Sequence, residues 1–99
     1  MAEQATGAAT SSQPVPIIKS ADMDSAMQQV AINTAQEAMA QHTVEKDIAA
    51  YIKRDFDKRY GPTWHVVVGK SFGSFCTHET NNFLYWYMGN IAVLLFKAG

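Results

Sequence analysis

The spacing of apolar residues changes once along this 99-residue chain, at Pro62. Before that point, apolar side chains recur at spacings of three and four. This pattern predicts one amphipathic helix from about Ser25 to Gln41, and a second from an N-cap at Thr43 to a stop signal at Gly61. After Pro62 the spacing falls to two, which is the period of strands with one buried face. The chain is therefore predicted to place its helices before most of its sheet.

Four strands are predicted after the helices, at residues 63–69, 72–78, 83–88 and 91–97, and one short strand before them at 15–19. Gly89-Asn90 fits the two-residue turn of a hairpin between the last two strands. Sequence spacing alone would also make residues 63–69 and 72–78 a local hairpin across Lys70-Ser71. Helices that are segregated from an antiparallel sheet define an α+β fold.

Residues 1–14 form a small polar segment with nothing large to bury, which predicts a disordered tail before a single domain at 15–99. Asp22 and Asp24 are candidate caps for the first helix. Pro16 lacks a backbone N–H, so the 15–19 strand is expected at a sheet edge or to begin there.

Composition narrows the classes of partner. Eight basic and nine acidic residues give a formal net charge of −1, without the basic face that nucleic acids or anionic membranes require. The longest apolar run, residues 91–96, is too short to span a bilayer, and no signal peptide is recognisable. Cys76 is the only cysteine, so no intrachain disulfide can form and a reducing intracellular compartment is expected.

The sequence gives little support for a catalytic site or a metal site. Cys76 and His78 would share a strand face as a thiol–imidazole pair, but no third orienting group or oxyanion donor is identifiable. His42, His65 and His78 lack the spacing of zinc ligands. Residues 69–71 resemble the end of a phosphate loop, but the upstream glycine is missing. We expect no enzyme, no metal and no cofactor, with a thiol-dependent enzyme as the least supported alternative.

The 72–78 segment mixes aromatic residues with Gly73 and Ser74, which leave the backbone open to close approach. Such a strand at a sheet edge can pair with a sister chain or accept a foreign peptide as an added strand. Tyr85, Trp86 and Tyr87 could supply aromatic surface for a groove, or they could simply fill the core.

Several consecutive motifs carry a family resemblance that extends over residues 18–99 and leaves out only the tail. The chain resembles the eight-kilodalton dynein light chain, a small peptide-binding hub. The motifs are Val44-Glu45-Lys46-Asp47-Ile48-Ala49-Ala50, Phe56-Asp57-Lys58-Arg59-Tyr60, Pro62-Thr63-Trp64-His65, Phe72-Gly73-Ser74-Phe75, Thr77-His78-Glu79-Thr80 and Ala92-Val93-Leu94-Leu95-Phe96-Lys97.

The resemblance implies a strand-exchanged homodimer. The strand near 72–78 would leave its own sheet and pair with the partner's strand near 64–69, in place of the local hairpin. His65 matches an interface histidine, and its burial there would favour the neutral imidazole, so the dimer would weaken in mild acid. The alternative is a core histidine without a switching role. The implied dimer-interface residues are His65, Ser74, Phe75, Cys76 and Thr77.

The resemblance also implies two symmetric grooves, each of which takes a disordered client segment with a Thr-Gln-Thr-like core as an added strand. The client glutamine would reach the start of the second helix. The implied partners are the dynein intermediate chain and other motif-bearing proteins, in the cytoplasm, on the cytoskeleton, or in a cilium or flagellum. A dynein-independent regulator that uses the same groove is the alternative. The implied peptide-binding residues are Glu45, Lys46, Phe72, Gly73, Ser74, Phe75, Cys76, Thr77, His78, Tyr85 and Tyr87.

Three positions depart from animal members of the family. Ala98 replaces a penultimate serine that is phosphorylated in those relatives, so this route of control is expected to be absent. Phe75 replaces a tyrosine, and Cys76 replaces an aliphatic residue, so oxidation at the implied interface becomes conceivable.

Overall fold

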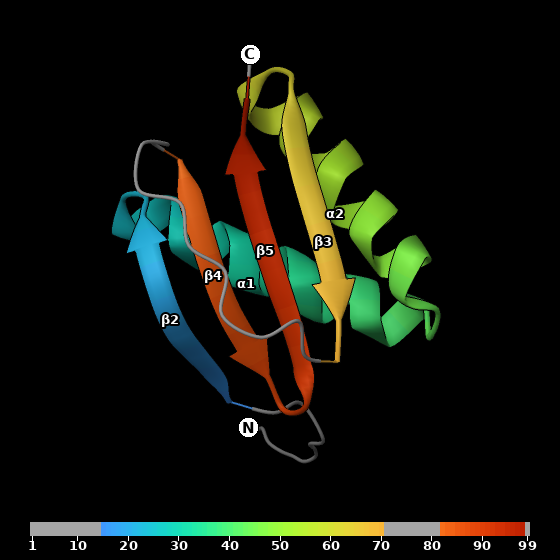
Figure 1. Cartoon of the computed structure of the whole chain (residues 1–99). Coiled ribbons are helices and arrows are strands. Elements are labelled where there is room, and N and C mark those ends of the chain that lie inside the picture. The colour runs from blue at the N-terminus through green and yellow to red at the C-terminus, as the bar shows by residue number, and fades with distance from the viewer. Residues whose placement is uncertain (1–14, 71–81, 99) are drawn as a thin grey trace, which may run out of the picture.

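The computed structural model describes residues 15–70 and 82–98, and within them it confirms the α+β fold (Figure 1). Both predicted helices and the predicted hairpin around Gly89-Asn90 are present. The predicted tail at 1–14 and the predicted strand at 72–78 lie outside the described residues. In chain order the elements are β2 (Pro16–Asp22), α1 (Ser25–Gln41), α2 (Glu45–Tyr60), β3 (Trp64–Gly69), β4 (Phe83–Met88) and β5 (Ile91–Lys97).

The strands form one antiparallel sheet in the order β2-β4-β5-β3. The β4–β5 hairpin is therefore central, and β2 and β3 are the outer strands of the described sheet. Gly89 adopts a φ of 66°, which explains why glycine suits this tight turn. β2 pairs with β4 across a register shift between Ile18 and Ser20.

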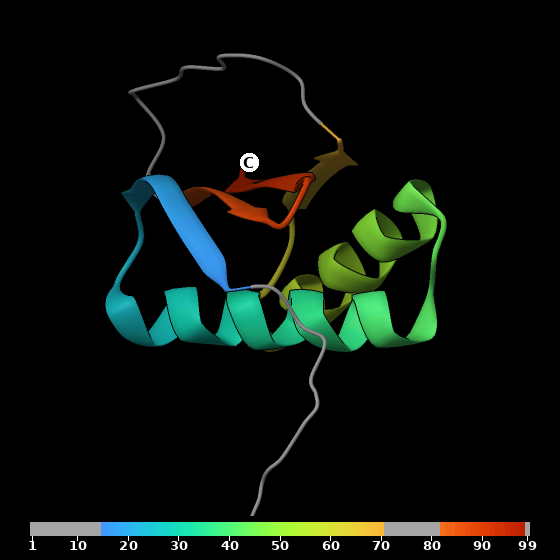
Figure 2. The same cartoon turned by 90° about the horizontal axis from the view of Figure 1, so that it is seen from below.

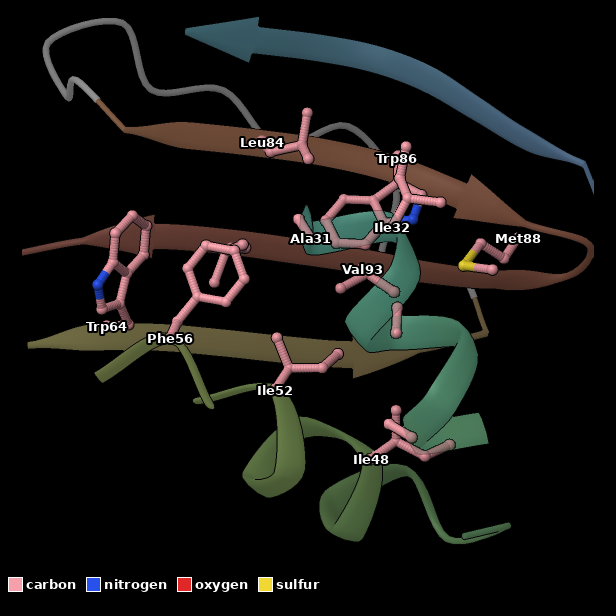
Figure 3. Close-up of a cluster of buried hydrophobic side chains, with 13 residues drawn as sticks. Ala31, Ile32, Ile48, Ile52, Phe56, Trp64, Leu84, Trp86, Met88 and Val93 are labelled. Atoms are coloured by element: carbon pink, nitrogen blue, oxygen red, sulfur yellow. The ribbon is translucent and has the colours of Figure 1, made fainter. Parts of the chain in front are cut away.

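Both helices cover the same face of the sheet (Figure 2). Ile48, Ile52 and Phe56, spaced four apart on α2, are buried and point toward the strands (Figure 3). Trp64 and Trp86 meet them from β3 and β4. Fully burying one large apolar side chain stabilises a fold by roughly 1.5–3 kcal/mol, so this layer holds the helices on the sheet.

The predicted cap of α1 is confirmed at Asp24, whose side chain accepts a hydrogen bond from Met27 N–H at 2.8 Å. The predicted cap of α2 at Thr43 is wrong. The N-cap is Val44, which has no side-chain hydrogen bond to offer. Its carbonyl accepts instead from the N–H groups of Asp47 and Ile48, both at 3.0 Å. The first turn of α2 thus lacks a capping side chain.

Within the described ranges, neither helix combines the length and apolarity that a bilayer crossing demands.

Candidate functional site

β3 carries the first component of the candidate site, an edge with open hydrogen-bonding groups. Within residues 15–70 and 82–98, β3 pairs with β5 along one side only (Figure 1). Its other side presents backbone N–H and C=O groups to any strand that can approach. Val67, near the middle of β3, is 45% exposed. The edge can therefore accept an added strand by main-chain hydrogen bonds.

A surface pocket of about 240 Å³ lies between α2 and β3. Ala49 and Ala50 have small side chains, so this flank of α2 leaves space open beside the strand. The pocket is lined by Ala49, Ala50, Lys53, Trp64, His65 and Val66. An open edge with a pocket beside it provides hydrogen bonds for a backbone and room for its side chains.

Asp57 fixes the geometry of this pocket. Its carboxylate accepts a hydrogen bond from Lys53 Nζ, one turn earlier on α2. It also accepts one from the backbone N–H of Trp64 at 2.9 Å. Both hydrogen bonds lower the pKa of Asp57, and the one from Lys53 has the larger effect. The end of α2 is thereby tied to the first residue of β3.

His65 lies on the face of β3 that points away from the helices. Its neighbours Trp64 and Val66 pack in the helix-side core, and side chains alternate along a strand. His65 is exposed in the single chain, and its ring stacks on Phe96 with centroids 5.3 Å apart and planes 26° apart. The remaining residues predicted for the dimer interface, Ser74 to Thr77, lie outside the described residues.

The same alternation divides the side chains of the aromatic strand β4 between the two faces of the sheet, and Tyr85 is itself buried. Trp86 is buried in the core beneath the helices, whereas Tyr85 and Tyr87 belong to a second cluster on the opposite face. The Tyr85 hydroxyl donates to the Tyr87 hydroxyl at 3.3 Å. That hydrogen bond, with a contribution from burial, raises the pKa of Tyr85. The second cluster consists of Phe83, Tyr85, Ala92 and Leu94, with Tyr87 and Phe96 packed against it.

Lys19 was not predicted to contribute to this face. Its Nζ lies 5.5 Å from the centroid of the Tyr87 ring, within the range of a cation–π contact. Lys19 falls at the register shift between Ile18 and Ser20. Its position next to Tyr87 therefore depends on an irregularity that simple alternation along the sequence does not reveal.

Glu45 and Lys46 begin α2, where Lys46 is exposed and Glu45 is half-buried. Because Val44 provides no side-chain cap, the N–H groups of this first turn can receive an outside acceptor. They belong to the helix layer, whereas Tyr85 and Tyr87 lie across the sheet, so one chain does not bring the two pairs together. The other predicted peptide-binding residues, Phe72 to His78, lie outside the described residues, as does the Cys76–His78 pair.

Comparison with known proteins shows which family this chain belongs to. The family described as dynein light chain type 1 matches residues 15–98, and the chain belongs to the dynein light chain family. Its fold is similar to that of the dynein light chain-like domain of the Fasciola hepatica calcium binding protein FhCaBP2, at a TM-score of 0.73 and 18% identity. That match covers 87% of this chain and 93% of that domain. The DLC-like domain of CsTAL3 matches at a TM-score of 0.69 and 24% identity, over 84% and 92% of the respective chains.

Proposed function

We propose that this protein is a non-catalytic homodimeric hub that binds extended peptides by strand addition and so dimerises its clients. One of its assemblies would be the dynein motor complex, which it would enter as a light chain. The observation that carries the proposal is the open edge of β3 beside the α2–β3 pocket. Membership of the dynein light chain family supports the motor role.

The proposed dimer forms when residues 72–78 of a second copy add to the open edge of β3. Each exchanged strand then presents its own outer edge to a client, next to the start of α2. The client's glutamine side chain accepts hydrogen bonds from the uncapped N–H groups at Glu45 and Lys46. Because the exchanged strand comes from the other protomer, the dimer also brings that protomer's Tyr85 and Tyr87 toward the client.

Two grooves in one dimer make the protein a clamp. A client that is itself paired engages both grooves, and its second contact is intramolecular, so the avidity exceeds the affinity of either contact alone. Association with dynein would place the protein in the cytoplasm, on the cytoskeleton. If the protein is instead a dynein-independent regulator that uses the same groove, the dynein intermediate chain will be missing from the proteins that copurify with it.

Calorimetric titration with a peptide that contains Thr-Gln-Thr tests the proposal. We expect one peptide per protomer and weaker binding by Lys46→Ala. Lys58→Ala, which removes the same charge at the far end of α2, serves as the matched control and should bind as the wild type does. Absence of binding by the wild type, or equal losses in both variants, would contradict the proposed groove.

A further inference from the structure

A second pocket, of about 320 Å³, lies on the flank of α2 that faces α1. It is lined by Tyr51, Arg54, Asp55 and Lys58, whose spacing of three and four places them on one side of the helix. The proposed peptide groove uses Ala49, Ala50 and Lys53, on the opposite flank. The two pockets are therefore separate surfaces of the same helix.

The two cations that line this second pocket, Arg54 and Lys58, outnumber its one lining acid, Asp55. Asp55 is already engaged, since it accepts hydrogen bonds from Arg59 Nε at 2.7 Å and from Thr34 Oγ1 at 3.2 Å. In contrast, neither Arg54 nor Lys58 forms an ion pair with any carboxylate in the described part of the chain, and both are exposed. Two like charges one turn apart repel each other, and a carboxylate placed between them would relieve that repulsion.

Tyr51 gives the pocket an oriented aromatic wall. Its hydroxyl donates to Glu37 Oε1 and accepts from Gln41 Nε2, both at 3.4 Å, and both partners belong to α1. The ring of His42 meets the ring of Tyr51 edge-on, with centroids 5.9 Å apart. These contacts hold the Tyr51 ring in place next to the two cations, where it can pack against an apolar side chain.

We propose that this surface is a second docking site, which takes a protein segment in which aspartate or glutamate alternates with apolar side chains. The acidic groups would pair with Arg54 and Lys58, and an apolar neighbour would pack on Tyr51. Two cations are too few for nucleic acid, where specific binders contact about 6–10 phosphates. They are also fewer than the roughly 4–8 that mark sites for anionic lipids. The proposal does not depend on the peptide groove.

The test uses the full chain and a fluorescein-labelled hexapeptide of three glutamates that alternate with three leucines, measured by anisotropy at low ionic strength. We expect the double variant Arg54→Gln with Lys58→Gln to weaken binding by about two- to thirtyfold, the range expected for two exposed ion pairs. Lys70→Gln with Lys97→Gln removes the same net charge elsewhere and should bind as the wild type does. A peptide with glutamine in place of glutamate should not bind.

An excess of Thr-Gln-Thr peptide should leave the acidic peptide bound, because the two surfaces lie on different flanks of α2. The proposal is overturned if the wild type does not bind the acidic peptide, if both double variants lose affinity equally, or if Thr-Gln-Thr peptide displaces it. It is also overturned if only vesicles of anionic lipid bind with dependence on Arg54 and Lys58.

Discussion

The carboxylate of Asp57 accepts a hydrogen bond from the backbone N–H of Trp64 at 2.9 Å, which joins the last turn of α2 to the first residue of β3. Phe56, the residue before Asp57, packs its ring edge-on against Trp64 with centroids 4.9 Å apart. A polar and an apolar contact between the same two elements thus set the separation of α2 from the open edge of β3. The width of the α2–β3 pocket depends on this separation.

Asp57→Asn should make the protein less sensitive to acid. The folded state lowers the pKa of Asp57, so its charged form stabilises the fold above the ordinary carboxyl range. This contribution is lost as the pH falls through the lowered pKa. The wild type should therefore exceed the variant in urea stability at neutral pH, and the difference should shrink below about pH 4. A constant difference at all pH values would contradict this role, and Asp47→Asn is the control at a position outside this contact.

Phe56→Ala should destabilise the fold by about 3–5 kcal/mol, because it leaves a cavity in a fully buried part of the core. Urea unfolding at a fixed protein concentration measures the change. Lys58→Ala, an exposed substitution two residues later, should remain within about 0.5 kcal/mol of the wild type. A loss below 1 kcal/mol for Phe56→Ala would show that this core repacks freely.

Val44→Asp should separate stability from peptide binding. A new side-chain acceptor at the N-cap would satisfy the N–H groups of the first turn of α2 and stabilise the helix by roughly 0.5–1 kcal/mol. The same N–H groups would then be unavailable to a client glutamine, so Thr-Gln-Thr peptide should bind more weakly. Val44→Ala supplies no acceptor and should leave both properties near wild type. If Val44→Asp stabilised the protein without weakening binding, the helix start would not be the glutamine site.

Local patterns in the sequence predicted the elements well, because helix and strand periods are set by residues close in sequence. Ile48, Ile52 and Phe56 marked the buried side of α2, and Gly89 marked the hairpin turn. The cap at Thr43 was predicted from residue type alone. The chain enters α2 one residue later than that cap requires, and Val44 takes the position.

The candidate site was harder to predict because its parts meet through long-range pairing. The pocket between Ala50 on α2 and His65 on β3 lies between two elements that Asp57 and Phe56 connect through Trp64. The register shift that brings Lys19 to Tyr87 has no local signature. The sequence left Tyr85, Trp86 and Tyr87 together as either groove surface or core, and only the structure places Trp86 on the helix side and the two tyrosines on the other face.

Native mass spectrometry of the protein with excess Thr-Gln-Thr peptide tests most directly whether the open edge of β3 is completed by a second copy and then by a client. The expected species contains two chains of 10.9 kDa each and two peptides. A single chain without peptide at neutral pH, or a dimer that takes up no peptide, would contradict the proposed hub.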